Sequence, residues 1–216
     1  CELGNRDSTV KLAAVGDSHL GAYVATLDAL AKKNDWSIDV IWKPACPYSA
    51  ATRVQKQSIV EACAAWNVAV QKLLKANSYQ VVLTTAKSGV RWETKAAESN
   101  DEVASSGFAT VWRELAESGT SVVVIRDNPR ARKDLAACLA LRSSVECSLD
   151  RTVALKPDPQ VAAVLQVASP RVSLIDITDI YCPDSRCEPV QAGVYVYRDN
   201  QHLTGSFVRT LQSLLE

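Results

Sequence analysis

The sequence contains no methionine, only two histidines and no run of 18 apolar residues. Because a translated chain starts with methionine, we expect Cys1 to mark a processed or excised piece of a longer protein. The missing apolar run excludes a membrane-spanning helix within these residues, and no signal-peptide pattern opens the chain. We therefore expect any membrane segment or export signal to lie upstream.

An excess of charge of one sign is also missing. Lys and Arg together number 24, as do Asp and Glu, so the formal net charge is zero. No basic run occurs, and a nucleic-acid partner is therefore not expected. Hydrophobic residues make up 47% of the 216 residues, which is typical of a folded domain with a substantial core. Without repeats or linkers, residues 1–216 are expected to form a single domain.

Cysteine, by contrast, occurs seven times. Six cysteines form couples that are close in the sequence, and we expect each couple to be a disulfide: Cys46 with Cys63, Cys138 with Cys147, and Cys182 with Cys187. A metal site is less favoured, because the chain has no Cys-x-x-Cys and only two histidines. Disulfides imply an oxidising, extracytoplasmic compartment. Cys1 is left over, to pair with an upstream cysteine or to carry a lipid.

Short apolar runs alternate with helical patterns along most of the chain. The predicted strands cover residues 10–15, 36–42, 79–85, 122–125 and 171–177, with a minor edge strand at 194–197. The predicted helices cover residues 19–33, 58–76, 99–117, 135–141, 158–168 and 204–215. This alternation predicts an α/β protein with a parallel sheet that is covered by helices on both faces.

Gly16-Asp17-Ser18 stands between the first predicted strand and the first predicted helix. In parallel sheets the chemistry sits at the carboxyl ends of the strands, so Ser18 is expected at the edge of a cleft formed by the strand-end loops. A strand-to-helix turn places free N–H groups beside the serine hydroxyl, which suits a nucleophile and the oxyanion it creates. The alternative is that Ser18 or Asp17 simply caps the helix.

Asp199 and His202 lie three residues apart, just before the last predicted helix. One turn can bring this carboxylate to the imidazole, and an Asp that orients a His beside a Ser is the logic of the catalytic triad. A solvated turn with a helix cap at Thr204 is the alternative. His19 is the rival base, but its position next to Ser18 turns it about 100° around the helix axis, which favours cleft lining or burial.

Several segments together resemble the SGNH (GDSL-type) hydrolase family, and in particular the SGNH domains fused behind multi-span membrane acyltransferases of the acyltransferase-three family in bacteria. These segments are Val15-Gly16-Asp17-Ser18-His19, Lys43-Pro44-Ala45-Cys46-Pro47, residues 125–129, and Tyr197-Arg198-Asp199-Asn200-Gln201-His202-Leu203. The resemblance implies a three-layer α/β/α fold with a flavodoxin-like, five-stranded parallel sheet. It makes Ser18 the nucleophile, His202 the general base and Asp199 its orienting acid.

The general SGNH pattern takes further oxyanion donors from a Gly after the second strand and an Asn after the third. This chain has Cys46-Pro47-Tyr48 and Ser88-Gly89 at those places, and Asn128 follows the fourth strand instead. Ser88, Gly89 and Asn128 are therefore the candidates for the oxyanion site or the cleft lining.

Cationic and aromatic side chains near the strand-end loops are candidates for substrate contacts. Arg91, Arg126 and Arg130 suit an anionic or sugar substrate, and each also fits an ordinary surface charge. Trp92, in the third-strand loop, is the candidate for stacking on a sugar.

The resemblance implies a serine-dependent O-acyltransferase, acetyl being the expected acyl group. The acceptor would be a hydroxyl of a cell-envelope glycan or glycolipid, mycolate-type lipids included. The N-terminal multi-span acyltransferase domain of the full-length protein would supply the acyl group, ultimately from acetyl-CoA, with no other cofactor and no metal. It would also tether the domain to the plasma membrane, outside the cytoplasm. The alternatives are an extracellular carbohydrate esterase or deacetylase and a catalytically weak substrate-binding module.

Overall fold

A six-stranded sheet forms the centre of the computed structural model, which describes residues 1–131 and 134–216. Its strands, in sheet order, are β1 (Glu2–Gly4), β3 (Ser37–Trp42), β2 (Lys11–Gly16), β4 (Val81–Thr85), β5 (Ser121–Ile125) and β7 (Val172–Ile175). The five strands from β3 to β7 run parallel, which confirms the predicted fold class. The added strand β1 pairs antiparallel with β3 at one edge. Three residues are too few to show the alternation that predicts a strand.

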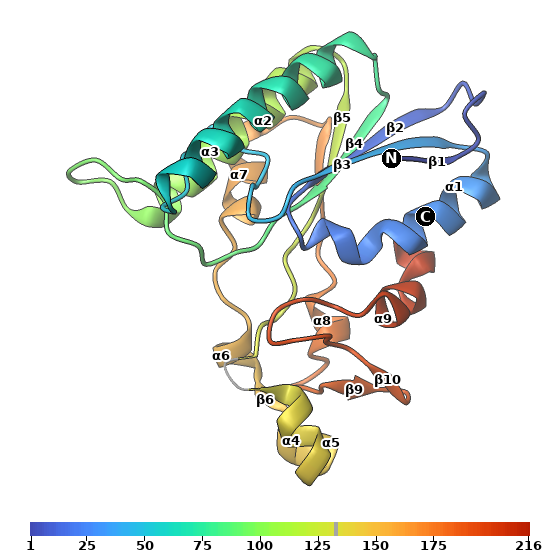
Figure 1. Ribbon diagram of the computed structural model, residues 1–216, viewed down its shortest axis with the longest axis vertical. Helices are drawn as coiled ribbons and strands as arrows, with labels where there is room; N and C mark the ends of the chain where they lie inside the picture. Colours follow the sequence, from blue (N-terminus) through green and yellow to red (C-terminus); the bar gives the residue numbers. More distant parts are fainter. Residues whose placement is uncertain (132–133) are drawn as a thin grey trace.

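Helices cover both faces of the sheet (Figure 1). One face carries α2 (Gln57–Ala76), α3 (Asn100–Glu117) and α7 (Pro159–Val167), and the other carries α1 (Val24–Asn34) and α9 (Gly205–Thr210). Successive residues of β2 enter the two cores in turn, because Ala13 and Val15 pack toward α2, α3 and α7, whereas Ala14 packs toward α1 and α9. Burial on both faces explains why the strands read as continuous apolar runs.

Short elements lie mainly below the sheet, in the view of Figure 1, between β5 and α9. They are α4 (Leu135–Leu141), α5 (Ser144–Cys147), β6 (Leu149–Asp150), α6 (Arg151–Ala154), α8 (Thr178–Tyr181), β8 (Arg186–Cys187), β9 (Val190–Gln191) and β10 (Val194–Tyr195). Of these, α4 and β10 match predicted elements, and the others span too few residues to show a period. No helix within the described residues is long and apolar enough to cross a bilayer.

Two predicted helices are shorter in the structure because 3₁₀ turns replace part of them. The first α-helix is preceded by the 3₁₀ turn Leu20–Tyr23, and the last is followed by Gln212–Leu214. In the first turn the Leu20 N–H donates to the Asp17 carbonyl at 3.2 Å, which is the i to i+3 pattern of a 3₁₀ helix. The chain therefore turns tightly directly after Ser18.

Three disulfides join the couples of cysteines that are close in the sequence. Cys46–Cys63 connects the loop after β3 to α2, and the other two bonds, Cys138–Cys147 and Cys182–Cys187, lie among the short elements below the sheet. Cys1 is exposed and forms no disulfide within the described part of the chain.

We expect one free thiol per chain when the non-reduced protein is unfolded in denaturant, because six of the seven cysteines are bonded. Titration with a chromogenic thiol reagent measures this count, and prior reduction with a phosphine should raise it to seven. Three or more thiols before reduction would contradict the disulfide assignment.

Candidate active site

Ser18 lies in the turn after β2, at the carboxyl edge of the sheet. Gly16 approaches the Thr85 carbonyl of β4 so closely that a Cβ would overlap it. Asp17 fixes the turn with both carboxylate oxygens, which accept the N–H groups of His19 at 2.9 Å and Lys87 at 3.0 Å. Because β2 lies between β3 and β4, this turn is the topological switch point at which α/β sheets bind ligands.

The structure brings Ser18, His202 and Asp199 together from positions up to 184 residues apart. His202 Nε2 lies 2.9 Å from Ser18 Oγ, and His202 Nδ1 lies 2.7 Å from Asp199 Oδ2. When Nδ1 donates its proton to the carboxylate, Nε2 carries the lone pair and is placed to accept the proton of the Ser18 hydroxyl. The arrangement has the connectivity that serine nucleophiles require.

Asp199 is held as a charged acceptor by its own turn. Its Oδ1 accepts the backbone N–H groups of Gln201 and His202, both at 2.8 Å. Burial acts to raise the pKa of Asp199, but these hydrogen bonds and the one from the His202 ring outweigh burial and lower it. The carboxylate is therefore ionised at neutral pH and fixes the orientation of the imidazole.

His19 is buried and bonds to Asp127 and not to Ser18, which leaves His202 as the candidate base. Its Nδ1 lies 2.5 Å from Asp127 Oδ1, which also accepts the Asn128 N–H at 2.9 Å. Asp127 Oδ2 accepts both the N–H and the hydroxyl of Ser88 at 2.7 Å. This one carboxylate thereby connects the turn after β2 with the loops after β4 and β5.

Charge stabilises the His19–Asp127 pair within the protein. Burial acts to lower the pKa of His19, but the charge and hydrogen bond of Asp127 outweigh it, and the net effect is a raised pKa. Burial acts to raise the pKa of Asp127, but the charge and hydrogen bond of His19 and the Ser88 bonds bring it below its usual range. Both shifts favour the charge-separated form of the pair.

A second buried carboxylate, Asp158, lies behind Asp127. Its Oδ2 accepts the Asp127 N–H at 2.8 Å, and its Oδ1 accepts the Gln160 N–H at 3.0 Å. Burial, followed by the negative charge of Asp127, raises the pKa of Asp158 to about 6.

Two of the three expected oxyanion candidates have their donors engaged elsewhere. Both donors of Ser88 bind Asp127, and the Asn128 amide donates to the carbonyls of Pro129 and Gln201, each at 2.9 Å. Ser88 is only 5% and Asn128 only 6% exposed, so the expectation that they bind an oxyanion is wrong. The N–H of Ser18, in contrast, has no acceptor among the described residues.

The structure gives different surroundings to the residues that were candidates for substrate contacts. Trp92 is 3% exposed, with its ring edge-on to Phe108 at 5.6 Å between centroids, so the expectation that it stacks on a sugar is wrong. Arg126 pairs with Asp176 at 2.7 Å and has a structural role. Arg91 is an exposed residue.

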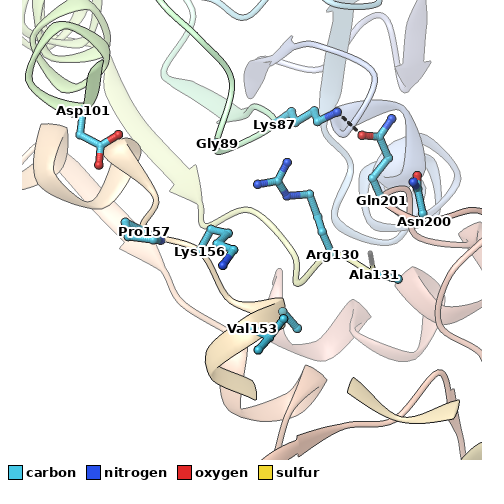
Figure 2. A pocket seen from close by; sticks show the side chains of 11 residues that line it. Lys87, Gly89, Asp101, Arg130, Ala131, Val153, Lys156, Pro157, Asn200 and Gln201 are labelled. Atoms are coloured by element: carbon cyan, nitrogen blue, oxygen red, sulfur yellow. Dashed lines mark hydrogen bonds between the residues drawn. The ribbon is translucent and has the colours of Figure 1, made fainter. Parts of the chain in front are cut away.

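A cavity of about 490 Å³ lies next to the segment that carries His202 (Figure 2). Lys87, Gly89, Arg130 and Gln201 are among its lining residues, and the Lys87 ammonium donates to the side-chain oxygen of Gln201. Neither Lys87 nor Gln201 could be predicted as a lining residue from the sequence, because a single lysine or glutamine in a loop has no diagnostic spacing. No three His, Cys, Asp or Glu side chains in residues 1–131 and 134–216 are grouped to hold a metal ion.

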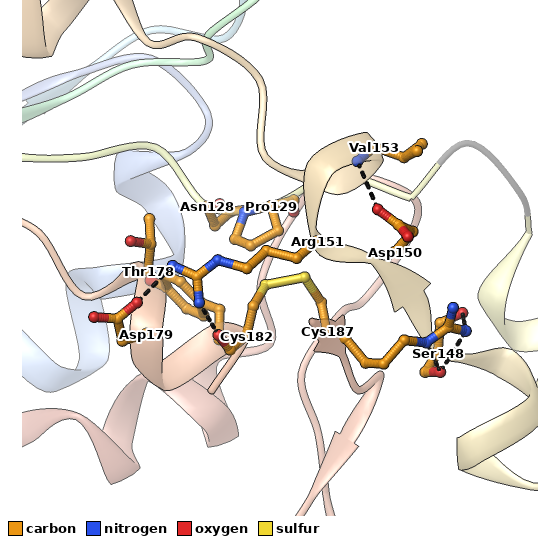
Figure 3. The surroundings of a disulfide bond; sticks show 12 residues. Asn128, Pro129, Ser148, Asp150, Arg151, Val153, Thr178, Asp179, Cys182 and Cys187 are labelled. Atoms are coloured by element: carbon orange, nitrogen blue, oxygen red, sulfur yellow. Dashed lines mark hydrogen bonds and ion pairs between the residues drawn. A yellow bond between two sulfur atoms is a disulfide. The ribbon is translucent and has the colours of Figure 1, made fainter. Parts of the chain in front are cut away.

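One wall of this cavity belongs to α6, and Figure 3 shows how α6 is held. Arg151, at its start, donates to the carbonyl of Cys182 and pairs with Asp179 at 2.5 Å. Cys182 is in turn bonded to Cys187, whose strand β8 pairs with β6 directly before α6. The loop closed by the Cys182–Cys187 disulfide therefore supports the cavity wall.

We expect Asp127→Asn to lower the free energy of unfolding by about 3–5 kcal/mol, because it removes one charge of a buried, hydrogen-bonded pair. Asp176→Asn is the matched control. It breaks the partly exposed pair with Arg126 and should cost about 1 kcal/mol or less. Denaturant unfolding measures both losses, and equal losses would contradict the role assigned to Asp127.

The raised pKa of Asp158 predicts that the stability of the protein depends on pH. Its pKa is higher in the folded protein (about 6) than the ordinary value of 3.8 for the group, so its contribution to stability is complete below the lower value and is lost as pH rises through the higher one. Relative to Asp158→Asn, which does not titrate, the wild type should lose about 3 kcal/mol of unfolding free energy between about pH 3 and about pH 8. A difference that stays constant over this range would contradict the assignment.

Comparison with known proteins relates this fold to two solved structures. The periplasmic domain of a lipopolysaccharide acetyltransferase from Salmonella ser. Paratyphi A is similar with a TM-score of 0.72 at 15% identity, over 97% of this chain and 83% of that chain. A Bacteroides fragilis protein provisionally assigned as an acylhydrolase is similar with a TM-score of 0.50 at 12% identity, over 98% and 87% of the two chains. At these identities the likeness is one of fold.

No curated protein matches the chain. A family model described as "SGNH domain (fused to AT3 domains)" matches residues 1–216. Because this match covers the whole sequence, the chain belongs to the family of SGNH domains that are fused to AT3 domains.

Proposed function

We propose that this domain is a serine-dependent O-acyltransferase in which Ser18 carries the acyl group. The observation that carries the proposal is the 2.9 Å contact between Ser18 Oγ and His202 Nε2, with Asp199 bound to the opposite ring nitrogen. Membership of a family fused to AT3 domains and the fold shared with an acetyltransferase domain support acyl transfer as the reaction class.

In the first step, Ser18 Oγ attacks the acyl carbonyl of the donor. His202 Nε2 takes the hydroxyl proton and passes it to the leaving group, while Asp199 stabilises the imidazolium. The bond between donor and acyl group breaks, and an ester forms on Ser18. The Ser18 N–H, which lacks an acceptor of its own, is suited to bind the oxyanion of the tetrahedral intermediate.

In the second step, a hydroxyl of the acceptor attacks the Ser18 ester. His202 takes the proton of this hydroxyl and returns it to Ser18 Oγ as the ester bond breaks, so the acyl group leaves on the acceptor and the enzyme is restored. Water in place of the acceptor gives hydrolysis by the same residues, which makes the identity of the attacking hydroxyl the whole difference between a transferase and an esterase.

Membership of the family supports a proposal for the donor and the acceptor. We infer that the AT3 domain of the full-length protein delivers the acyl group, ultimately from acetyl-CoA, without another cofactor. The acceptor is a hydroxyl of a cell-envelope glycan or glycolipid. Three disulfides are typical of an extracytoplasmic domain, which supports a location beside the envelope.

We expect a fluorophosphonate probe to label Ser18, because the contact with His202 increases the nucleophilicity of the hydroxyl. Ser18→Ala should abolish labelling and slow the release of acetate from an activated acetyl ester by about 10³-fold or more. Ser185→Ala is the control, because Ser185 is exposed in the loop closed by the Cys182–Cys187 disulfide and lies outside the site. Unchanged labelling in Ser18→Ala would refute the assignment of the nucleophile.

The two reaction types separate when an activated acetyl ester is offered with envelope glycans as acceptors. A transferase is expected to acetylate the glycan in preference to water, with both products absent in Ser18→Ala. Acetate as the sole product at saturating glycan would contradict acyl transfer and identify an esterase.

A further inference from the structure

The cavity beside the segment that carries His202 concentrates positive charge in a chain whose net charge is zero. Lys87, Arg130 and Lys156 line it, together with one carboxylate, Asp101, which lies on the opposite side from Lys87 in Figure 2. None of the three cations forms an ion pair within the described part of the chain. No direct ion pair therefore offsets their charge within the described residues.

Lys87 shows that the cations act on one another. Burial lowers its pKa, and the positive charges of Arg130 and Arg53 lower it further, against a smaller opposite effect of Asp127 and Asp17. Its ammonium donates to the neutral amide of Gln201 and not to a carboxylate. An anion in the cavity would relieve this repulsion.

Arg130 is built into the cavity wall. Gly89 has a φ of +58°, in the region that favours glycine. The Arg130 guanidinium lies against it, and a Cβ at Gly89 would overlap Nη2. Two backbone hydrogen bonds hold this part of the chain. The Arg130 N–H donates to the Ala154 carbonyl at 3.0 Å, and the Ala131 N–H donates to the Asn200 carbonyl at 2.9 Å. The guanidinium thus extends from a backbone that is hydrogen-bonded to two neighbouring segments.

We propose that this cavity binds an anionic group, a carboxylate or a phosphate, on the glycan whose hydroxyl is acylated at Ser18. The inference rests on the proposed function and defines its acceptor as an acidic glycan. A guanidinium binds such oxyanions through two parallel hydrogen bonds, and lysines add charge without a fixed direction. Gln201 lines the cavity, bonds to Lys87 and directly precedes His202 in the chain, so an anion bound here lies beside the segment that carries the base.

The test measures binding in a Ser18→Ala chain, in which no turnover occurs. Two matched pairs of probes are used: trigalacturonate with its methyl ester, and glucose 6-phosphate with glucose. We expect the charged member of at least one pair to bind about tenfold or more tightly than its neutral partner, and less tightly as salt is raised. The pair that shows the preference identifies carboxylate or phosphate. Equal binding within both pairs would overturn the proposal.

Variants of the lining residues test whether the preference for the charged probe arises in this cavity. Arg130→Gln and Lys156→Gln, each added to Ser18→Ala, should reduce the preference for the charged probe by about tenfold. Arg130→Lys should recover part of it, because the charge is kept and the planar fork is lost. Lys72→Gln is the matched control on the exposed surface of α2. A loss in Lys72→Gln as large as in Arg130→Gln would refute the site. Because Lys156 lies on a different segment, one misfolded variant does not decide the result.

Fluorophosphonate labelling of the wild-type chain separates this inference from the proposed function. A labelled Ser18 without a preference for anions rejects the anion site and keeps the acyltransfer proposal. A preference for anions with an unreactive Ser18 keeps the anion site and rejects Ser18 as the nucleophile.

Discussion

The buried carboxylate of Asp127 is the contact on which the arrangement of the site depends. A parallel sheet brings the carboxyl ends of its strands to one edge, but it leaves the loops beyond them free to differ. Asp127 accepts from His19 on the β2 turn, from Ser88 on the β4 loop and from Asn128 on its own loop. The desolvation of this carboxylate is offset by the His19 ring and by hydrogen bonds to both oxygens.

Both halves of the candidate triad are connected to this carboxylate. Ser18 is adjacent to His19, which binds Asp127 directly. His202 follows Gln201, whose carbonyl accepts the amide of Asn128, and the Asn128 N–H binds Asp127 in turn. The nucleophile and the base therefore come from opposite ends of the chain but are connected to one buried group. This connection positions the Ser18 hydroxyl and the His202 ring relative to each other before a substrate binds.

The parts of this account that are local in the sequence could be predicted from it. Burial on both faces makes the parallel strands apolar throughout, and the three-residue spacing of Asp199 and His202 closes into one turn. The roles of Ser88, Asn128 and Trp92 could not be predicted. They depend on which loops face each other across the sheet and on the packing of Trp92 against Phe108, and neither leaves a periodic or short-range signal.

The central claim is that Ser18 becomes acylated, and peptide mapping of the chain after brief exposure to an activated acyl donor tests it most directly. Acid quenching followed by mass spectrometry should find one acyl group on the peptide that contains Ser18, and removal of the His202 imidazole should slow its appearance. An acyl group confined to lysines or to the amino terminus, with the Ser18 peptide unmodified, would contradict the account.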